Sequence, residues 1–193
     1  QIGEQANAWA GRGDLAVYGG EDAGMGQAIA CFIHDTAEIE INLPKAFGVM
    51  TTPEMVGDIT LRKNQYEFPE PVGVILHEAF HARYSGWNYD LLNSLDPKVS
   101  DAFMLLEEAR IEGKAVYHYP ENALFLRASA MGLSFAEAEE SMEGKTTTGA
   151  FAHLAGLTLA RVDAGVLDDF DVANLERLIL TKISSTSSYS SAI

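Results

Sequence analysis

The stretch His77-Glu78-Ala79-Phe80-His81 determines which fold this chain of 193 residues is expected to adopt. It lies in a mostly apolar run from Pro71 to Gly86, where the proline suits the first turn of a helix and the glycine suits its end. Residues four positions apart share one face of a helix, so both imidazoles can point at the same spot. The run therefore predicts a buried helix that carries two neighbouring histidines.

Two histidines at this spacing are typical of a metal site. Two neutral imidazoles, from His77 and His81, together with an open position are what a catalytic Zn²⁺ requires. Glu78 directly follows the first histidine, where its carboxylate can hold a metal-bound water and take its proton. We therefore expect one zinc ion per chain. The alternative is a buried helix whose histidines are only hydrogen-bonded in the core.

A zinc hydrolase usually has three protein ligands. A third histidine six residues after the second is excluded, because Trp87 occupies that position, and Tyr84 stands where the accompanying glycine would be. A glutamate from a later helix is the other solution. Asp96 and Pro97 predict the start of such a helix, which is expected to run to about residue 116.

The later helix offers three glutamates. Glu108 and Glu112 border its expected buried side, so we predict Glu108 as the third metal ligand. Glu112 is then expected to orient a ligand histidine through its other ring nitrogen. Glu107 is the alternative ligand, since an error of one position in helix phase is easily made. For all three, the competing interpretation is a solvated acidic face paired with Arg110 and Lys114.

These motifs resemble those of the zincin metallopeptidases, in the branch in which a glutamate completes the metal site (gluzincins). The stretch 106–112 is also similar to an acidic-x-Arg-Ile-Glu signature of metallopeptidase-like domains found beside von Willebrand type A modules. The histidine helix resembles small predicted peptidases of bacteria and their phages. The resemblance covers roughly residues 37–118. It implies an α+β fold with a small sheet, an edge strand that pairs with an extended substrate, and two packed helices.

The resemblance implies zinc-dependent hydrolysis of peptide bonds, with Glu78 as general base. The strand expected at 37–43 is assigned the role of substrate-pairing edge. A further donor should stabilise the oxyanion, and His118, just past the second helix, is the candidate we single out. Its alternative is a surface histidine near a helix C-terminus. The other candidates are Tyr84, Tyr117, Tyr119 and His153.

The rest of the chain predicts a small N-terminal sheet followed by a mainly helical part. Strands are expected at 15–18, 28–34 and 37–43. A short helix is expected to open at 52–54, and further helices at 120–132, from a capping box at 134–137, at 151–164 and at 170–182. These elements predict a single domain over residues 1–183. The serine-rich segment 184–193 is expected to be a flexible tail.

Composition limits the partners. With 28 acidic and 13 basic residues, the formal net charge is −15, which argues against nucleic acid and against anionic lipid as partners. No apolar stretch approaches the roughly 20 residues of a membrane span. The single cysteine, Cys31, excludes an intrachain disulfide and suits a small core residue. A peptide or protein substrate is the expected partner.

The sequence also suggests a location for the protein and a second possible function. The chain starts at Gln1, which suggests that an upstream segment was removed, and a cytoplasmic or virion-associated location is expected. The alternative function is a structural protein of a virion or of another large assembly, which keeps the zincin fold with little or no turnover. In that case the metal serves stability.

Overall fold

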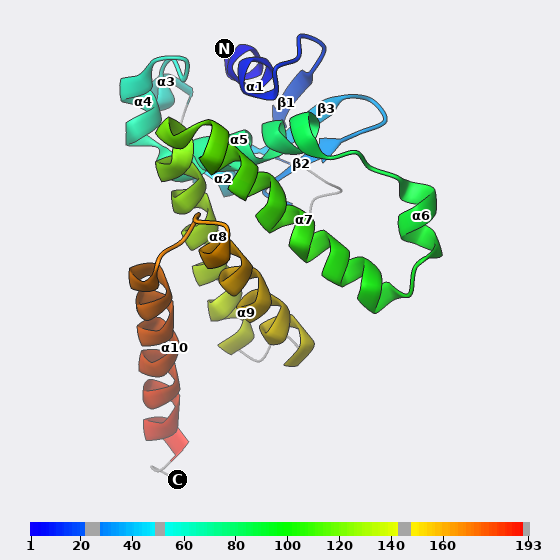
Figure 1. Ribbon diagram of the computed structural model, residues 1–193. Helices are drawn as coiled ribbons and strands as arrows, with labels where there is room; N and C mark the ends of the chain where they lie inside the picture. The colour runs from blue at the N-terminus through cyan, green and yellow to red at the C-terminus, as the bar shows by residue number, and fades with distance from the viewer. Residues whose placement is uncertain (22–27, 49–52, 143–147, 191–193) are drawn as a thin grey trace.

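The computed structural model describes residues 1–21, 28–48, 53–142 and 148–190, and these are mainly helical with a small sheet (Figure 1). The expected α+β class, with a small sheet near the N-terminus, is confirmed, although a helix, α1, precedes the strands. The elements are α1 (Ile2–Ala10), β1 (Ala16–Gly20), β2 (Ala30–Ile33), β3 (Glu38–Asn42), α2 (Leu43–Phe47), α3 (Pro53–Val56), α4 (Arg62–Glu67), α5 (Pro69–Tyr84), α6 (Tyr89–Ser94), α7 (Pro97–His118), a 3-10 turn (Pro120–Asn122), α8 (Ala123–Met142), α9 (Thr148–Asp163) and α10 (Asp169–Ser190).

Within the described residues, the strands form one mixed sheet in the order β1-β3-β2. β3 runs parallel to β1 and antiparallel to β2, with Ile39 opposite both Val17 and Phe32. The strand expected at the edge, 37–43, is therefore the central strand, and that prediction was wrong. Its alternation of polar residues with buried Ile39 and Ile41 reports which face of the strand is buried, not whether its edges are paired. The edge nearest α5 belongs to β2.

Helix α5 carries the two histidines and lies between two hydrophobic cores. On one side it packs against the sheet and α1, and on the other against α7 and α8. This explains why the helix is apolar on nearly all sides. Its residues in the sheet-side core are Ile75 and Ala79, and those in the other core are Val72, Leu76 and Phe80.

The contact between α5 and α8 is especially close at Gly73. A Cβ atom built there would lie only 1.9 Å from the carbonyl oxygen of Phe125. Two helices approach this closely only where one of them has no side chain. The glycine therefore fixes the distance between the histidine helix and its neighbour.

Two helices expected at 120–132 and from 134 onward are one continuous helix, α8. Gly132 does not end a helix but lies inside α8, where the Glu70 carboxylate packs against it. A Cβ atom built at Gly132 would lie 2.1 Å from a carboxylate oxygen of Glu70. Ser134 is not a cap but a buried mid-helix residue whose hydroxyl has no hydrogen-bond partner among the described residues. Residue type alone did not predict either position, because a glycine can also make room for a neighbouring side chain and a serine can lie buried inside a helix.

The C-terminal helices extend away from the sheet, and α10 ends far from the N-terminus (Figure 1). The first turn of α10 is held to α8 by Arg127, which forms ion pairs of 2.9 Å with Asp168 and with Asp171. The segment expected to be a flexible tail is helical through Ser190, and residues 191–193 lie outside the described part. A helix that is already nucleated gains one hydrogen bond for each further residue, so it can continue through a serine-rich segment.

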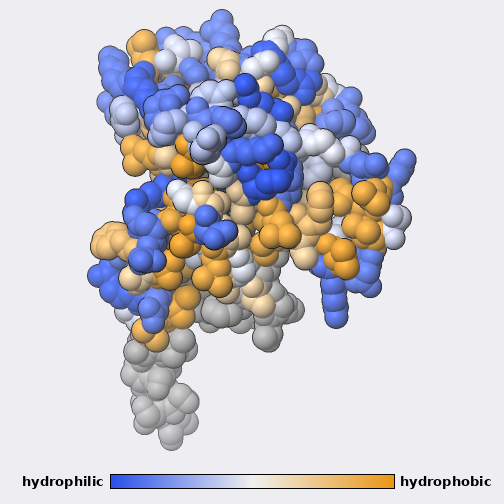
Figure 2. All heavy atoms as spheres, in the orientation of Figure 1, coloured by the Kyte–Doolittle hydropathy of each residue, from blue (hydrophilic) through white to orange (hydrophobic). Residues whose placement is uncertain are grey.

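Apolar side chains also reach the surface over α6 and the first half of α7 (Figure 2). They are Leu91, Val99, Phe103 and Leu106, each 45% exposed or more. Among the described residues, none of the helices combines the length and the apolar run that crossing a bilayer requires.

Candidate metal centre

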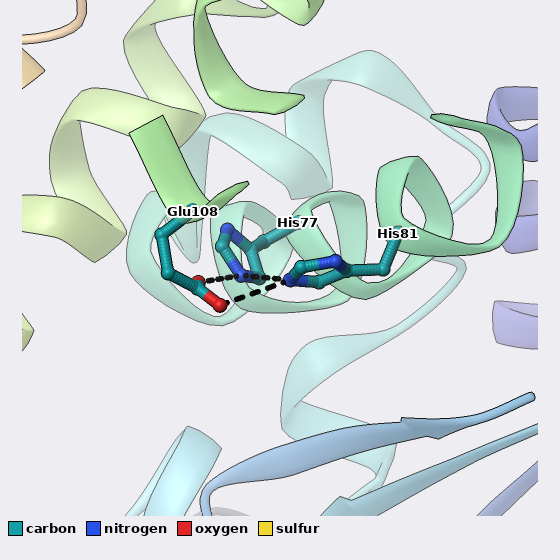
Figure 3. A group of neighbouring side chains, drawn as sticks. All are labelled: His77, His81 and Glu108. Atoms are coloured by element: carbon teal, nitrogen blue, oxygen red, sulfur yellow. Dashed lines mark hydrogen bonds and ion pairs between the residues drawn. The ribbon is translucent and has the colours of Figure 1, made fainter. Parts of the chain in front are cut away.

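Helices α5 and α7 bring His77, His81 and Glu108 together in one group that could hold a metal ion (Figure 3). The Nε2 atoms of the two imidazoles lie 3.1 Å apart. One carboxylate oxygen of Glu108 is 2.8 Å from Nε2 of His77, and the other is 3.4 Å from Nε2 of His81. The helical spacing of the histidines and the phase of α7 thus place the three predicted ligands on a common point.

The ring of His77 is held from behind by Glu112. Its Nδ1 atom lies 3.0 Å from the Glu112 carboxylate, which is almost wholly buried. Arg161 of α9 donates two hydrogen bonds of 2.8 Å to the same carboxylate and is itself buried. The position expected for Glu112 is therefore the one observed. The arginine, 49 residues further along the chain, was not anticipated.

The ring of His81 is held differently. Its Nδ1 atom lies 2.9 Å from the hydroxyl of Ser85, which donates a 2.6 Å hydrogen bond to Glu107. Arg110 donates to both carboxylate oxygens of Glu107, at 2.6 Å each. Glu107, the alternative ligand, thus lies behind the second histidine and not among the three grouped donors. The sequence sign of this arrangement that the prediction missed is a serine four residues after His81.

The charges around the centre shift its pKa values strongly. Burial alone would lower the pKa of His77, but the nearby Glu108 charge and the hydrogen bonds to Glu108 and Glu112 raise it well above its ordinary value. Burial raises the pKa of Glu108, and the charge and hydrogen bonds of the two histidines outweigh this and lower it. For Glu112, burial is likewise outweighed by Arg161 and His77, so its pKa is also lowered. The site favours ionised carboxylates and a cation between them.

Glu78 lines the same cavity as the three donors, which has a volume of about 310 Å³. Its carboxylate accepts a 2.8 Å hydrogen bond from the backbone N–H of Phe32 in β2. The edge strand thus fixes the carboxylate beside the metal centre. The apolar part of the lining comes from β2, α6, α7 and the loop after α5, through Ala30, Cys31, Phe32, Trp87, Leu92 and Met104.

The structure does not bring His118 to this cavity. It is exposed at the end of α7, about 15 Å along the helix from Glu108 given the usual rise per residue, and its ring packs near Tyr84 and Tyr117. The expected place of His118 in the cleft is therefore not observed, because ten residues of continuous helix separate it from Glu108. Tyr84, Tyr117 and Tyr119 do not line the cavity either, and the side chain of His153 lies outside the described part.

Cys31 was expected to be a small core residue and is instead half-buried at the cavity wall. Burial, followed by the charges of Glu78 and Glu40, raises the pKa of its thiol. In the sequence, Trp87 served only to exclude a third histidine at that position. Its ring in fact stacks on the ring of His81, with centroids 5.5 Å apart.

Comparison of the chain with protein-family models, curated proteins and solved structures finds no match.

Proposed function

We propose that the chain is a zinc-dependent peptidase. The observation that supports this most is that one cavity is lined by His77, His81 and Glu108 and also by Glu78, whose carboxylate is not one of the three grouped donors. Two imidazoles, one ligand carboxylate and a separate carboxylate beside them form a donor set used for metal-assisted hydrolysis. A purely structural zinc site has no need of the additional glutamate.

The spacing of the donors is compatible with a small tetrahedral ion such as zinc. Ligand atoms at about 2.0 Å from a tetrahedral zinc ion lie about 3.3 Å from one another. The three pairs of donor atoms here are separated by 2.8, 3.1 and 3.4 Å. Nitrogen and carboxylate donors also suit Zn²⁺ better than Ca²⁺ or Mg²⁺, which take oxygen ligands.

A bound zinc ion would supply Lewis acidity, which polarises the scissile carbonyl and acidifies the attacking water. Glu78 would accept the proton of that water and then pass it to the nitrogen of the leaving amine. The N–H of Phe32 holds the Glu78 carboxylate toward the cavity, so the base is oriented before substrate arrives. Glu112 would keep a proton on Nδ1 of His77 and leave Nε2 to bind the metal.

An extended substrate would pair with β2. Backbone groups in an antiparallel pair alternate between the two edges of a strand, and Ile29 accepts a hydrogen bond from the Asn42 N–H. Ala30 therefore directs its N–H and C=O away from β3, and Phe32 its C=O, since the Phe32 N–H is bound to Glu78; both residues line the cavity. The edge-strand role first assigned to 37–43 belongs in this proposal to β2.

Metal content and turnover test the proposal together. Purified chain should contain close to one zinc ion, and His77→Ala should lose it. Glu78→Gln should retain the zinc and lose at least about 100-fold in cleavage of a peptide library, the usual scale of general-base catalysis. A chain that folds normally without ever binding zinc would contradict the proposal. A zinc-loaded chain that cleaves nothing in the library would favour the alternative of a structural role.

A further inference from the structure

The hydroxyl of Ser85 lies between a metal-binding histidine and a carboxylate. We propose that Ser85, held by Glu107 and Arg110, is a positioning residue for His81. It keeps a proton on Nδ1 of the imidazole and thereby presents the Nε2 lone pair to the metal. The inference rests on the metal-binding part of the proposed function and not on peptide cleavage.

Counting the protons in this chain of contacts gives the direction of each hydrogen bond. Arg110 donates to both oxygens of Glu107, so this carboxylate is ionised and can only accept. The Ser85 hydroxyl has one proton, and at 2.6 Å it donates that proton to Glu107. The Ser85 oxygen can then only accept at its 2.9 Å contact with Nδ1 of His81. A neutral His81 ring therefore carries its proton on Nδ1 and leaves Nε2 unprotonated.

The network is fixed at both ends. Arg110 also donates a 2.8 Å hydrogen bond to the backbone carbonyl of Tyr84, in the last turn of α5. The Ser85 N–H donates to the carbonyl of His81, so the serine follows directly on the helix that carries the ligand. Glu107 is mostly buried, and its interactions therefore join the end of α5 to α7 on the His81 side.

The two ligand histidines are supported by the same chemistry in two forms. Behind His77, the Glu112 carboxylate contacts Nδ1 directly and is held by two hydrogen bonds from Arg161. Behind His81, the Glu107 carboxylate is held by Arg110 and reaches Nδ1 only through the Ser85 hydroxyl, which lies between the two. Each imidazole thus has an acceptor at Nδ1, a carboxylate for His77 and a carboxylate-bound hydroxyl for His81, which fixes its tautomer and makes it a better ligand.

Zinc affinity and the tautomer of His81 test this role. Ser85→Ala should weaken zinc binding about tenfold in competition with a chelator, the lower range for loss of such a contact. Ser85→Thr keeps the hydroxyl and should restore most of the affinity. Ser129→Ala is the control for loss of a serine hydroxyl, because its hydroxyl donates to the Leu126 carbonyl away from the centre.

Nitrogen NMR of the metal-free chain in mildly alkaline buffer reports the tautomer directly. His81 should show the Nδ1–H form in the wild type and in Ser85→Thr, and a mixture in Ser85→Ala. The proposal is overturned if Ser85→Ala leaves the tautomer unchanged, or if Ser129→Ala weakens zinc binding as much. Wild-type chain that binds no zinc would defeat the proposed function, while the NMR result would still decide the role of Ser85.

Discussion

His77 lies between two carboxylates, and this has consequences whether or not a metal is bound. Glu108 contacts one nitrogen of its ring and Glu112 the other. Because its two carboxylate neighbours raise its pKa well above the ordinary value, the metal-free chain favours the protonated form of this imidazole. The imidazolium then supplies positive charge where a metal ion would otherwise bind, so protons and metal compete for the same ring.

This competition predicts that zinc binding is coupled to proton release. A metal ion at Nε2 must displace the proton there, so binding near neutral pH should release about one proton. The zinc affinity should fall as the pH drops below the raised pKa of His77 and level off above it. Calorimetry in buffers of different ionisation enthalpy measures the proton count. Glu112→Gln removes one group that raises this pKa and should release fewer protons at the same pH.

An affinity that stays constant from acidic to neutral pH would contradict this view of His77. It would mean that the ring is already unprotonated at Nε2 in the metal-free chain. Glu112→Gln would then leave the number of released protons unchanged, because the pKa of His77 would not be raised in the wild type either.

At the scale of single residues, local patterns predicted the three grouped donors and the contact of Glu112 with His77, but not the contributions of Arg161 and Ser85. His77 and His81 follow from helical spacing, and Glu108 from the phase of a single helix. Arg161 could not be predicted as the partner of Glu112, since only the packing of α9 against α7 brings it there. Ser85 was within reach, because its spacing from His81 equals that of the two histidines, but a serine has too many roles to be assigned from spacing alone.

At the scale of elements, the buried pair of Glu112 and Arg161 joins α7 to α9. Both side chains are at most 3% exposed. Arg161→Met should therefore destabilise the fold by about 3–5 kcal/mol, because it leaves a buried carboxylate without its main partner. Chemical denaturation measures this change. Arg12→Met is the control, since it breaks the exposed pair with Asp14 and a long hydrogen bond to the Ala82 carbonyl, and it should destabilise the fold far less. Equal losses in both variants would mean that burial of the pair has no consequence.

The close contact of α5 with α8 gives a second prediction at this scale. Replacing a mid-helix glycine by alanine favours the helix by about 1 kcal/mol. At Gly73 the added Cβ would meet the Phe125 carbonyl, and overpacking of this kind costs about 1–3 kcal/mol or more. Because backbone atoms cannot rotate away, we expect net destabilisation of at least 1 kcal/mol, measured by thermal or urea unfolding.

The control for Gly73→Ala is Gly13→Ala. Gly13 lies outside the helices, and a Cβ atom there would have no heavy atom within 4 Å. Its free energy of unfolding should change little. If Gly73→Ala proves as harmless as Gly13→Ala, the close packing of α5 and α8 does not hold in solution.

Elements were predicted well where a pattern acts within one segment and poorly where it depends on neighbours. The start of α7 follows from Asp96, whose side chain accepts a hydrogen bond from the Lys98 N–H. The central position of β3 could not be predicted, because pairing depends on which strands lie beside it. Helix α1 was missed, since its N-terminus has no side-chain cap and its burial depends on the sheet and α5, although Gly11 marks its end.

At the scale of the whole molecule, the strong negative charge favours binding of a cation, but without selecting a site. A formal charge of −15 can attract zinc to many exposed carboxylates. Binding at the proposed centre differs because it bridges two helices, α5 and α7, that belong to one core. Only such binding should be linked strongly to the stability of the fold.

Zinc should therefore raise the melting temperature through this one centre. At a free zinc concentration about 100-fold above Kd, binding stabilises the native state by about 2.7 kcal/mol. For a chain of this size, that corresponds to roughly 5–10 °C, measured by calorimetry with zinc and with a chelator. The metal-free chain should remain folded, because the His77 imidazolium then lies between Glu108 and Glu112. Glu108→Ala should abolish the shift, and a shift that persists in this variant would place the stabilising zinc elsewhere on the acidic surface.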